Sequence, residues 1–173
     1  MTQYSKRMVI VHWLTLALLI AAWFLGDAVN EARHEGNATL MGYAVHAVVG
    51  GTILLLTILR LYFRSKDGVP PPVGQSLMDK VAKGIHHALY ALLILLPVSG
   101  IMQVATSKVC DALRAWDATL LPAKFEGVPA HGVHEILVTA LIVLGVVHVL
   151  GAIKHQFIMK DGLMERMSLR RKD

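Results

Sequence analysis

Four long apolar stretches without a single Asp, Glu, Lys or Arg dominate this sequence. They cover residues 8–25, 40–59, 84–107 and 136–153, and each holds at least 18 residues. A helix needs about 20 apolar residues, with a lower limit near 17, to cross the hydrocarbon core of a bilayer. Only 17% of all residues are charged, against about 25% in a typical soluble domain. The sequence therefore predicts an all-α fold, a four-helix transmembrane bundle.

The apolar stretches and their flanks predict a single membrane-embedded domain over residues 1–173. We expect its helices at about 8–27, 40–63, 82–106 and 132–158.

A fifth, shorter segment is expected at about 108–121, where apolar residues from Val109 to Leu120 recur at helical spacing between charged ones. This pattern is typical of an amphipathic helix lying on the membrane surface. The segment either caps the outer end of the bundle or only anchors the chain to the membrane.

The basic residues predict the orientation of the chain. Thirteen of the 17 Lys and Arg residues lie before the first helix, between the second and third, or after the fourth. Because basic residues stay on the cytoplasmic side, the N- and C-termini are both expected in the cytoplasm. The net charge of +5 is thus a topology signal, and no nucleic-acid partner is expected. The first apolar stretch is too long for a signal peptide and lacks a cleavage site, so we expect it to be retained.

Histidines lie inside these apolar stretches or at their edges, where ionisable groups are rare and usually functional. Ordered by depth, they form two layers. The inner layer holds His12, His86, His87, His148 and His155, and the outer layer holds His46, His131 and His134. A b-type haem with two axial histidines needs two imidazoles from different helices at similar depth. Two such layers predict two haems.

The fourth helix can serve both layers. His134 and His148 are 14 residues apart, which places them on nearly one face and about 21 Å apart along the axis. In the outer layer His46 pairs with His134, because His131 lies roughly 100° off that face. In the inner layer the partner of His148 is either His12 or His86. His155 lies further out, where another molecule can dock.

Glycines beside the histidines allow two interpretations. Gly42, His46 and Gly50 share one face of the second helix, which leaves flat space for a planar group. The same spacing is typical of close helix–helix contacts in membranes. Histidines alone would also suit a proton relay in a haem-free transporter. Cys110 is the single cysteine, so the chain has neither an internal disulfide nor a Cys-x-x-Cys-His motif for covalent haem attachment.

The order and spacing of several short pieces resemble a known family. These pieces are Tyr4-Ser5, His12-Trp13, His46, His86 before Tyr90, Leu96-Pro97, His134, His148, and His155 followed by Phe157, Lys160-Asp161, Leu163 and Arg166-Met167. Together they resemble the prokaryotic di-haem cytochrome b561 family, four-helix, quinone-linked cytochromes of the inner membrane that include superoxide oxidase.

The resemblance implies two haem b groups, with His12 and His148 on one iron and His46 and His134 on the other. It further implies a ubiquinone site near the cytoplasmic haem, with His155 and His86 as its candidate residues. A bacterial inner-membrane protein in contact with lipid is then expected.

The function implied is transmembrane electron transfer linked to ubiquinone, as in a superoxide:ubiquinone oxidoreductase. The alternative is a haem-carrying subunit that relays electrons for a partner dehydrogenase or a periplasmic redox protein. The outer connection with Cys110 and Trp116 does not follow the family pattern. Because this connection would shape access to the outer haem, the resemblance says least about the identity of the electron donor.

Overall fold

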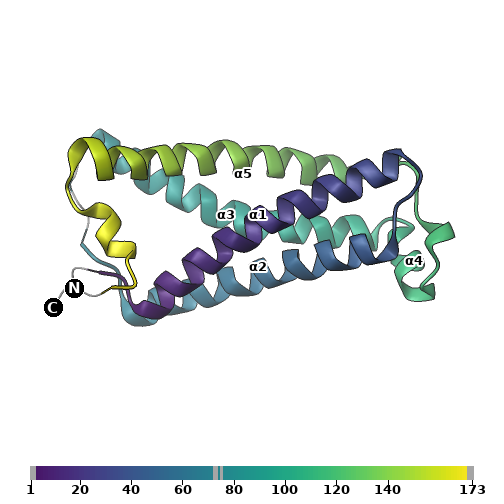
Figure 1. Ribbon diagram of the computed structural model, residues 1–173, viewed down its shortest axis with the longest axis horizontal. Coiled ribbons are helices and arrows are strands. Elements are labelled where there is room, and N and C mark those ends of the chain that lie inside the picture. The colour runs from purple at the N-terminus through teal and green to yellow at the C-terminus, as the bar shows by residue number, and fades with distance from the viewer. Residues whose placement is uncertain (1–2, 72–73, 75, 171–173) are drawn as a thin grey trace.

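The computed structural model describes residues 3–71, 74 and 76–170, and this part of the chain is helical without any strand. Its long helices are α1 (Lys6–His34), α2 (Leu40–Asp67), α3 (Leu77–Ala105) and α5 (Pro129–Ile153). A π-helical segment, η2 (Lys154–Met159), continues α5. The helices α1, α2 and α3, and α5 together with η2, are each long and apolar enough to cross a membrane. The predicted all-α, four-helix transmembrane bundle is confirmed (Figure 1).

Local signals set the helix starts. Ser5 caps α1 by accepting a hydrogen bond from the Met8 backbone N–H. A capping box of Ser76 and Asp79 starts α3 several residues before the expected 82. At its other end α1 continues past the expected 27 to His34. Tertiary contacts explain this extension, because the buried Arg33 hydrogen-bonds to the Ala123 carbonyl.

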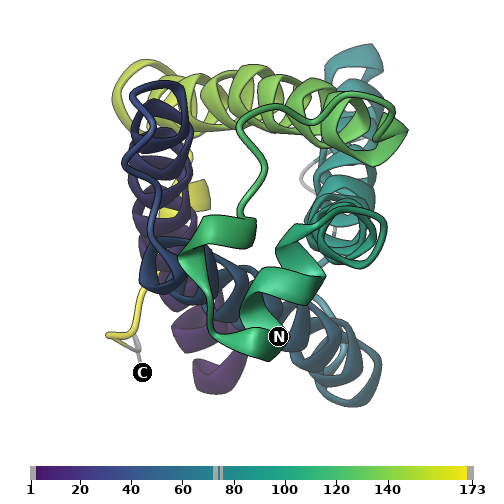
Figure 2. The ribbon, with the colours of Figure 1, turned by 90° about the vertical axis from the view of Figure 1, so that its right-hand side faces the viewer.

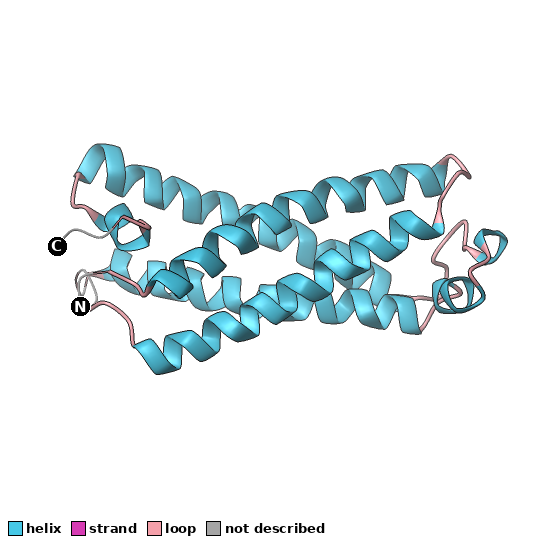
Figure 3. Ribbon diagram, turned by 60° about the horizontal axis from the view of Figure 1, so that its bottom comes forward, coloured by secondary structure: helices cyan, strands magenta, loops and turns pink. Residues whose placement is uncertain are grey.

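The helices pack as two pairs. α1 lies along α2, and α3 lies along α5, while α2 and α3 join the pairs. By contrast, α5 makes little close backbone contact with α1 or α2. Figure 3 shows the helices running side by side between two ends of the molecule. We call these the termini end, where residues 3–6 and 154–170 lie, and the loop end, where residues 106–128 lie.

A short connection closes the loop end. It contains α4 (Val109–Ala115) and the 3-10 turn η1 (Ala118–Leu120), and Figure 2 shows it across the end of the bundle. Val109 and Ala112 are buried, while Trp116 is 60% exposed and adopts a left-handed conformation that ends α4. The expected apolar stripe therefore faces the bundle only in its first part.

Ties between distant residues hold the termini end together. Arg7 pairs with Asp67 across α1 and α2. The 3-10 segment η3 (Leu163–Met167) folds back, so that the Met167 carbonyl accepts from Trp13 Nε1 at 3.1 Å. Both described ends thus lie at one end of the bundle, as the topology prediction requires. Arg171 and Lys172, which that prediction also used, lie outside the described residues.

Apolar side chains cover the outside of the bundle. Phe24, Val48 and Ile136 are each more than 60% exposed. In water such a surface would drive association, whereas lipid is a suitable solvent for it. Most of the apolar surface therefore faces the membrane.

Candidate functional site

At the loop end, two histidine rings face each other across the bundle. His46 of α2 and His134 of α5 have ring centroids 6.3 Å apart and an interplanar angle of 76°. We call them the loop-end pair. Each ring packs against a glycine of the neighbouring helix. A Cβ added at Gly26 would lie 3.0 Å from His46 Cε1, and one at Gly100 would lie 3.2 Å from His134 Cε1. These two glycines make room for the rings.

Hydrogen bonding sets which nitrogen of His134 carries its proton. Ser99 Oγ donates to the Leu96 carbonyl at 2.7 Å and lies 2.9 Å from His134 Nδ1. Because the single hydroxyl hydrogen points at the carbonyl, Oγ accepts from the Nδ1–H of His134. Nε2 of the neutral ring is then unprotonated and able to bind a metal.

His46 lies against α1 and is less well satisfied. The Ala22 carbonyl is near its ring, yet among the described residues its buried Nδ1 has no partner in hydrogen-bond geometry. A buried nitrogen without a partner is costly in a membrane. The ring therefore lacks one interaction that a ligand or a small rearrangement would supply.

At the termini end lies a second pair, which we call the termini-end pair. His12 of α1 and His148 of α5 have ring centroids 6.4 Å apart and an interplanar angle of 77°. Arg60 of α2 directs Nη1 at His12 Nδ1. The exposed His86 of α3 lies closer to His148, with ring centroids 5.1 Å apart.

These spacings can be compared with the needs of a haem. A bond of about 2.0–2.1 Å from metal to imidazole nitrogen, with the ring centre about 1.2 Å beyond it, puts two opposed imidazoles roughly 6.4 Å apart between ring centres. The loop-end and termini-end pairs fit this value. The spacing of 5.1 Å between His86 and His148 is too short for a metal ion between opposed rings. Both fitting pairs also bridge helices whose backbones are not closely packed.

Other histidines of the two layers have different partners. His131 Nε2 lies 3.4 Å from Glu135 Oε1, and its ring stacks on Phe125 of the outer connection. His87 is exposed. Neither is part of a facing pair.

His155 forms a polar pair of its own at the termini end. Its Nδ1 lies 2.5 Å from Asp161 Oδ2, and both side chains are 24% exposed. The other carboxylate oxygen, Oδ1, accepts from the Leu163 backbone N–H at 3.0 Å. The hydrogen bond from His155 is the main cause that lowers the pKa of Asp161. The carboxylate therefore stays ionised and holds the Nδ1–H of His155.

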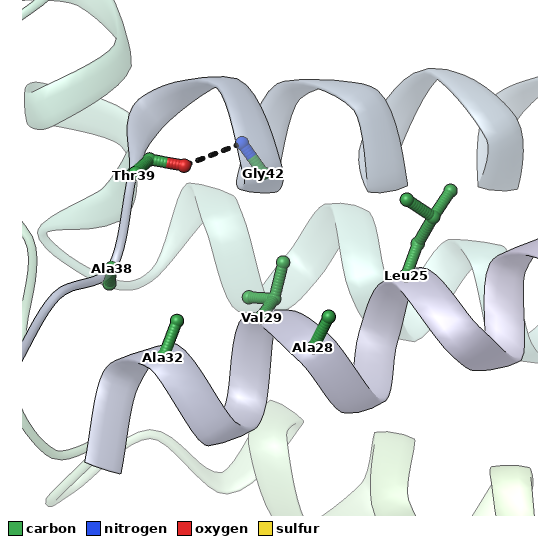
Figure 4. A pocket seen from close by; sticks show the side chains of 7 residues that line it. All are labelled: Leu25, Ala28, Val29, Ala32, Ala38, Thr39 and Gly42. Carbon is green, nitrogen blue, oxygen red and sulfur yellow. Dashed lines mark hydrogen bonds between the residues drawn. The ribbon is translucent and has the colours of Figure 1, made fainter. Parts of the chain in front are cut away.

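The glycines beside His46 prove to have separate roles. A Cβ at Gly42 would lie 3.2 Å from Val29 of α1, so this glycine serves the close helix contact. It lines a small apolar pocket between α1 and α2 near the loop end (Figure 4). Gly50 has no neighbour within 4 Å and leaves open space on its helix.

Sequence reasoning missed Gly26, Gly100 and Ser99. All three lie on helices other than the one that carries the histidine they contact. No periodicity within one helix could reveal them.

Comparisons with known proteins identify the family of this chain. The family model for prokaryotic cytochrome b561 matches residues 3–168. Cytochrome b562 of Cereibacter sphaeroides is 30% identical over 95% of this chain and 94% of its own length. Cytochrome b561 homolog 2 of Escherichia coli is 28% identical over 90% of this chain and 86% of its own. The probable superoxide oxidase CybB of Yersinia pestis is 26% identical over 95% of both. The chain therefore belongs to the prokaryotic cytochrome b561 family, multi-pass proteins of the bacterial inner membrane that use haem b in transmembrane electron transfer.

Proposed function

We propose that this chain holds two haem b groups and carries electrons from the loop end to ubiquinone at the termini end. The observation that supports this most directly is the spacing of its two facing histidine pairs, 6.3 Å and 6.4 Å between ring centroids. A haem bound in this way supplies reversible one-electron transfer at an iron with no open coordination position.

In this proposal His46 and His134 hold one haem, and His12 and His148 hold the other. The ring spacing favours His12 over His86 as the partner of His148. Glycine contacts and the bond to Ser99 orient the loop-end rings. The bond to Ser99 thus orients His134 before the cofactor binds, which lowers the cost of ordering this ligand.

Quinone chemistry needs protons, and the His155–Asp161 pair is suited to supply them. Ubiquinone takes up two electrons and two protons to become ubiquinol. Asp161 holds the Nδ1–H of His155, so the second ring nitrogen is the one available for proton exchange. Phe157 and Ile158, 68% and 75% exposed, place lipid-facing apolar surface beside this pair. We include His86 in the same proposed quinone site because its ring lies next to that of His148, a proposed ligand of the termini-end haem.

The donor at the loop end is proposed to be superoxide, the substrate class in the name of the Yersinia pestis relative. Two superoxide anions would each lose one electron to give two molecules of dioxygen, while one ubiquinone gains both electrons. Lys108, Arg114 and Lys124 lie in the loop-end connection and could steer an anion. The same connection carries Asp111, Asp117 and Glu126, so its charges balance and steering contributes little to this proposal. With both termini in the cytoplasm, as the basic residues predict, this end would face the periplasm.

The test begins with haem content and then adds turnover. Purified chain should show two b haems per polypeptide in a pyridine haemochrome assay. Superoxide should then reduce the haems, and added ubiquinone should reoxidise them. Two haems without reduction by superoxide would exclude this donor and favour the relay subunit, which needs a partner protein. No haem at all would refute the proposal.

A further inference from the structure

Arg60 carries a charge that no carboxylate of the described chain balances. It lies on α2, seven residues before Asp67 and thus about 10 Å deeper in the bundle. The Asp67 carboxylate already pairs with Arg7. An arginine stays charged in proteins, and a charge within a membrane helix is costly unless it has a partner. Arg60 therefore needs an anion from outside the described chain.

Its present contacts are few. Nη1 meets His12 Nδ1, and the guanidinium carbon lies 5.8 Å from the centre of the Tyr90 ring. Nε is buried and has no hydrogen-bond partner among the described residues. A guanidinium has five N–H donors in a planar fork, so most of its capacity is unused.

The contact with His12 is also incompatible with a metal on the other ring nitrogen. A neutral imidazole that binds a metal through Nε2 carries its proton on Nδ1. Nδ1–H and the guanidinium are both donors, and they cannot hydrogen-bond to each other. Binding of a metal would therefore free Nη1 of Arg60 for a different acceptor.

We propose that Arg60 binds a carboxylate side arm of the haem held by His12 and His148. This inference rests on the haem assignment proposed above. A carboxylate matches the planar donor fork and can accept two of its N–H groups. The haem is favoured over a lipid phosphate because Nε is buried inside the bundle and Nη1 touches the ligand ring itself.

The first test compares haem retention in variants of the purified holoprotein. Arg60→Gln should speed the loss of the termini-end haem to excess apomyoglobin by about ten- to a hundredfold, because a charge-assisted bond is lost. Arg60→Lys should give an intermediate rate, since a lysine keeps the charge but not the fork. Lys66→Gln removes an exposed charge on the same helix and should change nothing. The loop-end haem, retained at its normal rate, reports that each variant is folded.

A second test identifies the source of the anion. The protein is reconstituted with haem dimethyl ester, which lacks the free carboxylates. The wild-type chain should then lose its termini-end cofactor as fast as Arg60→Gln loses ordinary haem, in nanodiscs of either neutral or anionic lipid. If the ester is held as firmly as haem, or if only anionic lipid slows the loss, the anion is not the haem carboxylate and the proposal is wrong.

Failure of the haem assignment would look different. If His12→Ala keeps both haems, the ligand assignment is refuted whatever Arg60 does. If His12→Ala loses one haem while Arg60→Gln retains it at the wild-type rate, only the role of Arg60 is refuted.

Discussion

The two histidine pairs have almost the same ring spacing, yet their surroundings differ in charge. The loop-end pair is held by neutral groups, namely the Ser99 hydroxyl and the backbone at Gly26 and Gly100. The termini-end pair has a guanidinium at His12 and a third imidazole, His86, beside His148. Charges and proton carriers near a redox centre tune its potential and couple it to protons. If each pair holds a haem, as proposed above, we expect the loop end to pass electrons and the termini end to couple electron transfer to protons as well.

The sharpest test of this comparison removes one ligand from each pair. His134→Ala should eliminate the loop-end haem and His148→Ala the termini-end haem, so that each variant retains one haem per chain. His87→Ala, an exposed histidine outside both pairs, is the matched control and should retain two. Haem is counted by pyridine haemochrome. Loss of both haems from either variant would mean that the sites are not independent.

A smaller effect is expected from filling the space beside the loop-end rings. Gly26→Val should push His46 away, because even a Cβ there would lie 3.0 Å from its Cε1. Overpacking of this kind costs about 1–3 kcal/mol. We expect roughly tenfold or greater weakening of haem binding at the loop end. The rate of haem loss to excess apomyoglobin measures this weakening. Gly84→Ala is the control: a Cβ at Gly84 has no neighbour within 4 Å, so both haems should be lost at the wild-type rate.

Ser99 offers a test of how the loop-end pair is held, because its hydroxyl contacts His134. Ser99→Ala removes one acceptor for the His134 Nδ1–H and leaves the Leu96 carbonyl as a second one. Loss of such a partner typically weakens metal binding by about 10- to 100-fold. We expect an effect near the lower limit, with a raised potential of the loop-end haem because its ligand becomes less basic. Potentiometric titration of both haems measures this. Ser99→Thr keeps the hydroxyl and should restore the wild-type value; a shift at the termini-end haem instead would contradict the local role.

The smallest effect concerns Asp161, which contacts His155 at the termini end. Asp161→Asn should leave both haems in place and slow ubiquinone reduction several-fold, because His155 loses the carboxylate that holds its Nδ1–H. An unchanged rate would separate the pair from quinone chemistry.

The same residue makes a prediction for stability. Because the pKa of Asp161 is lowered in the folded chain, its stabilising contribution is present above the ordinary aspartate pKa of about 3.9. That contribution is lost as the pH falls below 3.9 and through the lowered pKa. In detergent, the thermal unfolding midpoint of the wild-type chain should therefore be higher than that of Asp161→Asn at neutral pH. The difference between the two midpoints should disappear in acid. A difference that grows in acid would have the wrong sign.

Much of this protein could be predicted from the sequence because the deciding signals are local. Uninterrupted apolar length identifies the membrane helices, and helical period places His134 and His148 on one face. The sorting of histidines by depth follows from the same two regularities. The helix ends were less predictable: α1 continues past residue 27 because Arg33 bonds to a carbonyl 90 residues away.

The tertiary structure alone decided how the helices turn toward one another. Depth could not separate His12 from His86 as the partner of His148, whereas the ring distances of 6.4 Å and 5.1 Å favour His12 in the ligand assignment that we propose. The contacts of Gly26, Gly100 and Ser99 likewise depend on the rotation and spacing of neighbouring helices. Sequence determines which face of a helix is apolar or bears a ligand, but interhelical packing determines what that face meets.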